Sequence, residues 1–206
     1  MNEVIQFFQS RQPVNLLIVI VNIVVFIILS FIGNTEDAMF MAAHGASVTP
    51  LITVGKEYYR LFTSMFLHFG FYHIAYNMLS LIFLGDILER ETGPVRYLII
   101  YLLGGAAGNL LSLFVSMRSG DYAVSAGASG AIFAVIGALL YIALRNRRTF
   151  GQQNMKRLLL MVLLMIMQGA IDKGVDGSAH LGGLIGGFLL AAALYHKKRS
   201  DHYERL

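Results

Sequence analysis

Six long stretches of this sequence contain no Asp, Glu, Lys or Arg. They are Pro13–Thr35, Leu61–Gly85, Tyr97–Met117, Tyr122–Leu144, Leu158–Ile171 and Gly177–His196. A helix needs about 20 apolar residues to cross the hydrocarbon core of a bilayer. Five stretches reach that length, and Leu158–Ile171 has only 14 residues. In lipid, only helices and closed barrels satisfy their own backbone hydrogen bonds. We therefore predict an all-α membrane protein, a bundle of helices that cross the bilayer.

The composition excludes the other broad classes. Hydrophobic residues make up 56% of the 206 residues, and charged residues only 14%. A soluble domain carries about 25% charged residues. The shortage of charge argues against a soluble globule, and more strongly against disorder. The chain has no Cys, so disulfides and thiolate metal sites are excluded.

The basic residues predict the orientation of the bundle. If all six stretches cross and the N-terminus is cytoplasmic, 12 of the 16 Lys and Arg residues lie in the inner segments and 4 in the outer ones. This distribution follows the positive-inside rule. If Leu158–Ile171 did not cross, the basic cluster Lys197–Arg199 would lie outside. The net charge of +4 is thus an orientation signal, and no nucleic-acid partner is predicted.

We therefore predict one domain over residues 1–206, in the plasma membrane, with both termini cytoplasmic. The predicted spans are approximately 14–33, 72–89, 95–117, 126–144, 157–171 and 178–196. The first apolar run is not followed by the small-residue cleavage site of a signal peptide, so we expect it to remain as an anchor. The connection Asn34–Arg60 has apolar residues of its own and is expected to lie on the membrane surface.

Polar side chains inside three spans are the candidate functional residues, because such groups are costly in lipid. His73 and Asn77 are four residues apart and hence on one helical face. Ser129 and His180 lie near the start of the fourth and sixth spans, which run in the same direction. At about 1.5 Å per residue, they lie about 8 Å and 6 Å below the outer edge. We expect the four side chains to meet in one cavity that opens to the extracytoplasmic side.

These residue types suit acyl transfer. A serine hydroxyl becomes a nucleophile when a neutral histidine within about 2.6–3.2 Å takes its proton. His73, Asn77 and the Ser129 backbone N–H are candidate donors to the oxyanion. No intramembrane carboxylate is placed to orient His180, so we predict a dyad. Small residues allow helices to approach closely. The glycines expected to do so are Gly127, Gly130, Gly183 and Gly187.

Other polar residues have simpler explanations. Serines such as Ser80 and Ser112 are expected to bond to the carbonyl one turn back in their own helix. We expect His68 to be a structural hydrogen-bonding residue. A pair of histidines with an asparagine is able to bind a metal, but no carboxylate joins them in register. We therefore predict no metal and no cofactor.

Five separated motifs between residues 56 and 196 resemble those of the rhomboid intramembrane serine proteases. They are Tyr59-Arg60, His68-x4-His73-x3-Asn77, Glu89-x3-Gly93, Gly127-Ala128-Ser129-Gly130 and Ala179-His180-x2-Gly183-x3-Gly187. The resemblance implies the minimal six-span bacterial type, a rhomboid-like bundle with a membrane-surface first loop.

By this resemblance, Ser129 is the nucleophile, His180 the general base, and His73 and Asn77 line the oxyanion hole. Phe133 packs on the catalytic histidine, and Arg60 and Glu89 are structural. The implied substrates are single-span membrane proteins, cleaved near the outer face. Two alternatives stay open, which are an inactive rhomboid-like protein that binds membrane clients and a small polytopic transporter. Both serine and histidine are present, and no inverted repeat typical of a transporter is evident.

Overall fold

The computed structural model describes residues 11–171 and 174–195, and within them the regular elements are helices. The long helices are α2 (Pro13–Ile32), α6 (Gly70–Ser80), α7 (Asp86–Thr92), α8 (Pro94–Ser119), α9 (Ser129–Arg145), α10 (Arg147–Ile171) and α11 (Gly177–Leu194). The short ones are α3 (Ala38–Ala43), α4 (Thr49–Thr53) and α5 (Arg60–Thr63). A π-helical turn, Leu81–Gly85, joins α6 to α7, so that Gly70–Thr92 forms one helix of 23 residues. The predicted all-α class is confirmed.

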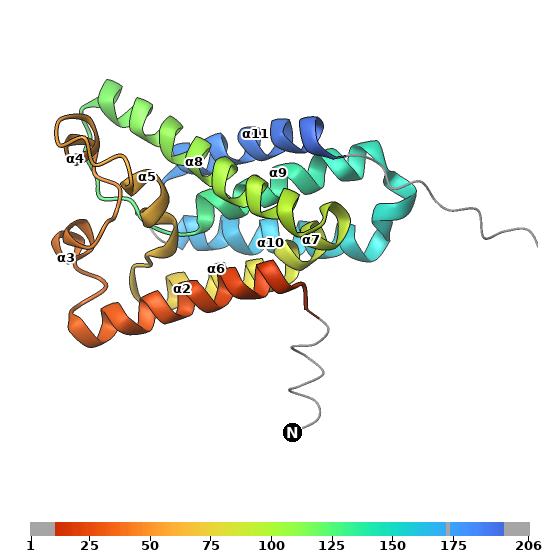
Figure 1. The fold of residues 1–206 in the computed structure, drawn as a ribbon, viewed down its shortest axis with the longest axis horizontal. Coiled ribbons are helices and arrows are strands. Elements are labelled where there is room, and N and C mark those ends of the chain that lie inside the picture. The colour runs from red at the N-terminus through yellow and green to blue at the C-terminus, as the bar shows by residue number, and fades with distance from the viewer. Residues whose placement is uncertain (1–10, 172–173, 196–206) are drawn as a thin grey trace, which may run out of the picture.

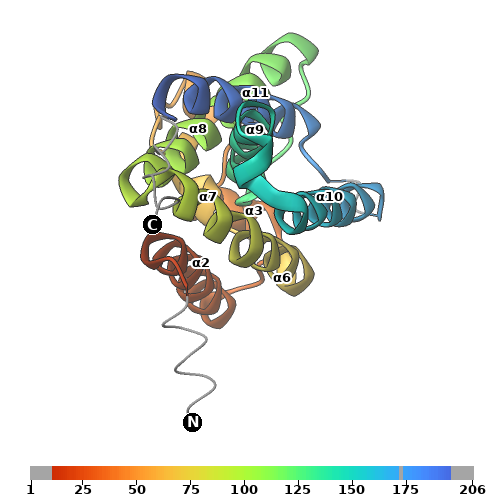
Figure 2. The ribbon, with the colours of Figure 1, turned by 90° about the vertical axis from the view of Figure 1, so that its right-hand side faces the viewer.

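The long helices run along one axis, and the short ones gather at one end (Figure 1). Seen from the opposite end, α9 lies in the middle of the bundle, with α8, α11, α10 and α6 around it and α2 at the periphery (Figure 2). The most extensive packing joins α9 to α11 and α11 to α8. Most side chains of α9 are buried. The core of the bundle is therefore built around the helix that begins with Ser129.

Glycines allow α9 and α11 to pack with their backbones in contact. A Cβ atom added at Gly183 would overlap the carbonyl oxygen of Gly130, and one at Gly187 would overlap that of Ala134. From the other side, a Cβ atom at Gly137 would overlap the carbonyl oxygen of Leu184. Only residues without side chains fit these positions. The distance between the two helices is set by this contact.

Replacing Gly187 by Ala tests this contact. A methyl group there has no room against the backbone of α9, so the helices must separate. We expect Gly187→Ala to lower the free energy of unfolding by about 1–3 kcal/mol and to lower the melting temperature in detergent. Gly177→Ala is the matched control, because a Cβ atom at Gly177 has nothing within 4 Å. Equal melting temperatures for the two variants would contradict the close contact.

The surface of the bundle is suited to lipid. Exposed apolar side chains run along the whole of α2, among them Leu17, Val24 and Phe31. Among the described residues, four helices are long and apolar enough to cross a membrane: Pro13–Ile32, Gly70–Thr92, Pro94–Ser119 and Gly177–Leu194. A helix that is apolar on its exposed face needs an apolar solvent. The chain is an integral, multi-pass membrane protein.

Two predicted spans differ in detail from the helices. The helix of the predicted fourth span, α9, begins at Ser129 and not near residue 126, because Ser125 is held in an extended bridge with Ser47. The predicted fifth span lies within α10, a 25-residue helix with a kink at Gly151, whose φ is 72°. The two termini and residue 196, the predicted end of the sixth span, lie outside the described residues. The crossing of α10 therefore stays a prediction.

Carboxylates of α7 hold the start of α2. Asp86 accepts a hydrogen bond from the Gln12 backbone N–H (2.8 Å), and Glu89 accepts one from that of Asn15 (2.6 Å). Tyr97 donates to the Asn15 side chain at 2.6 Å. The first N–H groups of a helix have no acceptor within it. Two acidic side chains from a distant segment satisfy those of α2, and this agrees with a structural role for Glu89.

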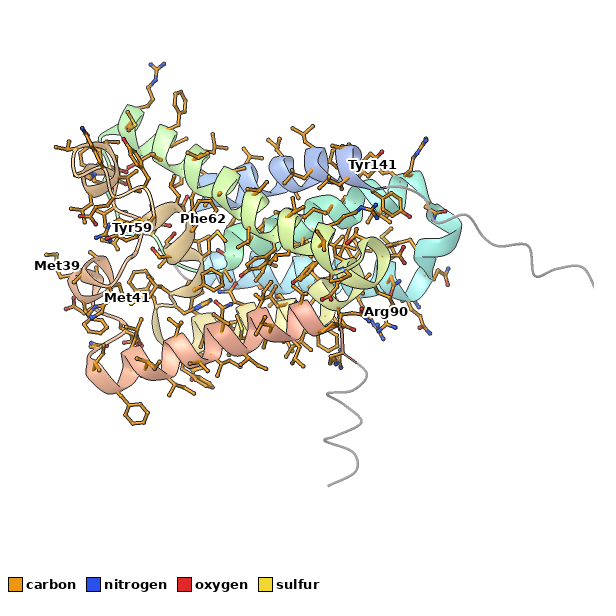
Figure 3. The ribbon with its side chains drawn as sticks, in the orientation of Figure 1. Met39, Met41, Tyr59, Phe62, Arg90 and Tyr141 are labelled. Carbon is orange, nitrogen blue, oxygen red and sulfur yellow. The ribbon has the colours of Figure 1, made fainter. Side chains whose placement is uncertain are left out.

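The connection between α2 and α6 is folded against the opposite end of the bundle, where the short helices gather (Figure 1). Arg60 is buried, donates to the carbonyl oxygens of Ala42 and Ala46 (2.7 and 2.8 Å), and pairs with Glu57 at 2.6 Å. Met39 and Met41 lie at this end, and Arg90 lies towards the other (Figure 3). Arg60 therefore organises the connection, in agreement with the structural role that the resemblance implies.

Candidate active site

Ser129 is the first residue of α9, and the segment before it is fixed by contacts with distant parts of the chain. The backbone of Ser125 pairs with that of Ser47, with N–H···O distances of 2.8 and 2.9 Å. The Gly127 N–H donates to the Ser64 carbonyl at 2.9 Å. Gly127 has a φ of 136°, which favours glycine. The backbone before the serine is not helical, but these hydrogen bonds hold it in place.

His68 supports the same segment. Its Nε2 accepts a hydrogen bond from the Ala128 backbone N–H at 3.4 Å, and its side chain is buried. Its ring lies edge-on to that of His73, with the centroids 5.2 Å apart. His68 therefore supports the residue directly before Ser129 through a hydrogen bond, in the structural role that we predicted.

His180 lies in the first turn of α11, and its Nε2 is 2.9 Å from the Oγ of Ser129. The ring of Phe133, one turn beyond the serine in α9, stacks on the imidazole with the centroids 4.2 Å apart and the planes at 18°. Both helices begin at the same end of the bundle, so that close packing of α9 against α11 brings the two side chains together. The hydroxyl and the imidazole are within hydrogen-bond distance.

His73 directs a donor to the same place. Its Nδ1 faces the Phe69 backbone N–H at 3.3 Å and accepts from it. In a neutral ring with Nδ1 as acceptor, Nε2 carries the proton. Nε2 lies 2.8 Å from the position that a Cβ atom at Gly127 would take. The absence of a side chain at residue 127 therefore leaves room for the imidazole beside the nucleophile.

Asn77 lies apart from this group. It is buried, its Nδ2 donates to the His73 carbonyl at 3.0 Å, and its Oδ1 has no hydrogen-bond partner among the described residues. The cavity beside Ser129 is not lined by it. The amide one turn below His73 is instead bonded back to its own helix. Of the four predicted polar side chains, three share the cavity and Asn77 does not reach it.

A cavity of about 330 Å³ lies beside the serine and histidine. Its polar lining includes His73, Asn109, Ser125, Ser129, Asp176 and His180. Its size is typical of a pocket for a small ligand or a short chain segment. Sequence reasoning missed Asn109, Ser125 and Asp176. Asn109 is polar within a charge-free stretch and was thus detectable, whereas Ser125 and Asp176 look like ordinary boundary residues.

Asp176 accepts hydrogen bonds from three serines and one backbone amide. One of them comes from Ser112, at 2.5 Å. The expectation that Ser112 bonds to its own helix is therefore wrong, because a carboxylate is a stronger acceptor than a carbonyl already used by the helix. Ser80 does bond one turn back, to the Tyr76 carbonyl at 2.9 Å.

The charge state of Asp176 follows from these bonds. Burial disfavours the ionised form, but the hydrogen bonds from Ser112, the Ala179 N–H, Ser178 and Ser125 outweigh it and hold the pKa of Asp176 below its ordinary value. The side chain is an anion at neutral pH. In the described part of the chain, no group of three His, Asp or Glu side chains is placed to hold a metal ion.

Comparison with known proteins shows the family to which the chain belongs. The Rhomboid domain family model matches residues 55–197. The chain belongs to the rhomboid family. It is 41% identical over 147 residues to RHOMBOID-like protein 1 of Arabidopsis thaliana, covering 71% of this chain and 37% of that protein.

Two bacterial rhomboid relatives come from Bacillus subtilis (strain 168). The chain is 38% identical to Rhomboid protease GluP over 200 residues, which are 97% of this chain and 38% of that protein. It is 35% identical to Putative rhomboid protease YdcA over 142 residues, 69% of this chain and 70% of that protein. The chain thus spans well under half the length of GluP and of RHOMBOID-like protein 1. Both bacterial relatives are named as rhomboid proteases, the second of them as a putative one.

The stacked ring of Phe133 predicts a measurable effect. Phe133→Leu removes the flat surface that orients the imidazole, and we expect the rate at which a serine-reactive fluorophosphonate labels Ser129 to fall roughly tenfold. Phe114→Leu is the matched control, because Phe114 is an exposed phenylalanine of α8. Equal rates for the two variants would show that the stack does not orient His180.

Proposed function

We propose that this rhomboid is an intramembrane serine endopeptidase that uses Ser129 as nucleophile and His180 as general base. The observation that carries the proposal is the distance of 2.9 Å between the Ser129 Oγ and the His180 Nε2, beside a cavity. A base must lie within hydrogen-bond reach of the proton that it takes. Two isolated polar residues on different membrane helices have no structural need to meet in this way.

In the proposed reaction, the Ser129 Oγ attacks the carbonyl carbon of the scissile bond while its proton passes to the His180 Nε2. The tetrahedral intermediate collapses, the C–N bond breaks, and His180 gives the proton to the leaving amine. Water then attacks the acyl-enzyme ester, again with His180 as base, and restores the serine hydroxyl. Each step uses the same pair, as in other serine hydrolases.

The negative oxygen of the intermediate needs donors. The Ser129 N–H belongs to the first turn of α9, where N–H groups have no acceptor within the helix and the helix dipole favours negative charge. The His73 Nε2–H points to the same space. In the proposal, the carboxamide of Asn77 turns from the His73 carbonyl towards the cavity and becomes a third donor when substrate is bound.

The proposed substrates are single-span membrane proteins. The catalytic pair lies at the start of two helices of the bundle, the end that the charge distribution predicts to be extracytoplasmic. The chain would thus act in the plasma membrane, with its site open to that side. A substrate helix must unwind to expose its scissile carbonyl, so residues that weaken helices, such as Gly and Pro, favour cleavage.

Loss of either partner tests the pair. We expect Ser129→Ala and His180→Ala each to reduce cleavage of a reconstituted single-span substrate by roughly 10⁴-fold or more, because neither residue acts without the other. Ser80→Ala is the matched control and should cleave at the normal rate, since its hydroxyl bonds within α6. A fluorophosphonate probe should label wild type and not Ser129→Ala. Normal cleavage by Ser129→Ala would exclude the proposed nucleophile, and unlabelled wild type would favour a client-binding protein or a transporter.

The oxyanion donors predict a graded result. Removal of one such donor costs about 10²–10³ in kcat, and we expect this loss for His73→Ala with KM little changed. Asn77→Ala should lose less, because its amide must first break the bond to the His73 carbonyl. Melting temperatures measured in parallel show whether either variant has lost its fold. A larger kcat loss for Asn77→Ala than for His73→Ala, with the fold retained, would reverse the assigned order of the two donors.

A further inference from the structure

We propose that Asp176 is a positioning residue, which holds Ser129 and His180 in register by tying three segments together through one carboxylate. This inference rests on the proposed function, because it concerns the same pair. The carboxylate contacts neither the Ser129 nor the His180 side chain in the bonds described above. It acts through the backbone segments on which they are carried.

The two oxygens of the carboxylate have separate partners. Oδ1 accepts from the Ser178 Oγ (2.8 Å) and from the Ala179 N–H (2.9 Å), and so caps α11 itself. Oδ2 accepts from the Ser112 Oγ of α8 (2.5 Å) and from the Ser125 Oγ in the segment before α9 (2.9 Å). One oxygen therefore completes the helix that carries the base, while the other reaches out to the two neighbouring segments.

We call the two hydrogen bonds that Oδ2 accepts, from Ser112 and Ser125, the tie. The tie lies close in sequence to both Ser129 and His180. Ser125 precedes Ser129 by four residues, and Asp176 precedes His180 by four residues. The Asp176 carbonyl also accepts the His180 backbone N–H at 3.1 Å. The carboxylate thus joins the two chain segments immediately before the nucleophile and the base.

The tie acts where the glycine contacts do not. Gly183 and Gly187 fix the helical residues of α9 and α11 against each other, but residues 125–128 are outside any helix and are not held by these contacts. Helix ends fray, and hydrogen bonds in the first turn are the first to open. A shift of about 1 Å in reacting groups can cost roughly 100-fold in rate. A fixed anchor before both first turns therefore stabilises the distance on which the reaction depends.

The chemistry of the tie favours rigidity. Hydrogen bonds to an ionised acceptor are roughly twice as strong as those between neutral groups. Four donors converge on this one carboxylate, and the resulting low pKa of Asp176 keeps it ionised at neutral pH. A single helix cap needs only Oδ1. A purely local capping role does not explain the two bonds to Oδ2, which join separate segments.

Two variants separate the tie from the cap. Ser112→Ala/Ser125→Ala removes both donors to Oδ2 and leaves the carboxylate on α11. Asp176→Ser keeps a residue that caps helices well but is too short to reach α8 and residue 125. The readouts are the rate of fluorophosphonate labelling at Ser129, the split between kcat and KM on a single-span substrate, and the melting temperature of the full chain in detergent.

We expect both variants to label at least tenfold more slowly than wild type and to lose at least tenfold in kcat, with KM within threefold. Asp176→Asn, which has the shape to bond to both serines, should label at least fivefold faster than Asp176→Ser. The control Ser80→Ala/Thr92→Ala removes two buried hydroxyls that bond within their own helix segment, and it should label at the wild-type rate.

Labelling within twofold of wild type in both variants would overturn the positioning role. So would a loss that merely follows the melting temperature, or Asp176→Asn as slow as Asp176→Ser. If the double variant does not fold, Ser125→Ala alone is held to the same criteria. A wild type labelled at Ser129 with unaffected variants refutes only the tie, whereas a wild type that is not labelled refutes the proposed function as well.

Discussion

The backbone contact between α9 and α11 is the constraint on which the rest of the structure depends. Glycines at residues 183 and 187 place the carbonyl oxygens of α9 against the backbone of α11, where no side chain fits. Because both helices begin at the same end of the bundle, this contact brings their first turns together. The 2.9 Å separation of Ser129 and His180 is therefore a consequence of helix packing, and the chemistry that we propose requires packing at least this close.

Near that contact, the end of the bundle that carries Ser129 and His180 holds a network of polar groups. The loop before Ser129 is held by Ser47, Ser64 and His68, and α11 is capped by Asp176. Each of these bonds satisfies a backbone group that has no partner in regular secondary structure. The same bonds orient the serine. In this region, one network of hydrogen bonds both satisfies the backbone groups outside the helices and positions the residues of the site.

Much of this was predictable from the sequence, and the exceptions have physical causes. Charge-free stretches and glycine spacing predicted the helices, and the motifs pointed to the residues that meet in the cavity. The sequence predicts the start of α9 three residues too early, because hydropathy does not distinguish an extended segment from a helix. The sequence predicts that the Ser112 hydroxyl bonds within its own helix, because it does not show that a carboxylate 64 residues away faces it. The rotamer of Asn77 is likewise not predictable, because the sequence does not show that its amide bonds back to the His73 carbonyl.

The way in which α2 is held has a consequence for the substitutions that this helix tolerates. The carboxylates of Asp86 and Glu89 bind main-chain amides of residues 12 and 15, and every amino acid except proline offers the same amide. Recognition of this kind is indifferent to the identity of most side chains along the first helix. An exchange of one apolar residue for another on the lipid-facing side of α2 therefore leaves both hydrogen bonds in place.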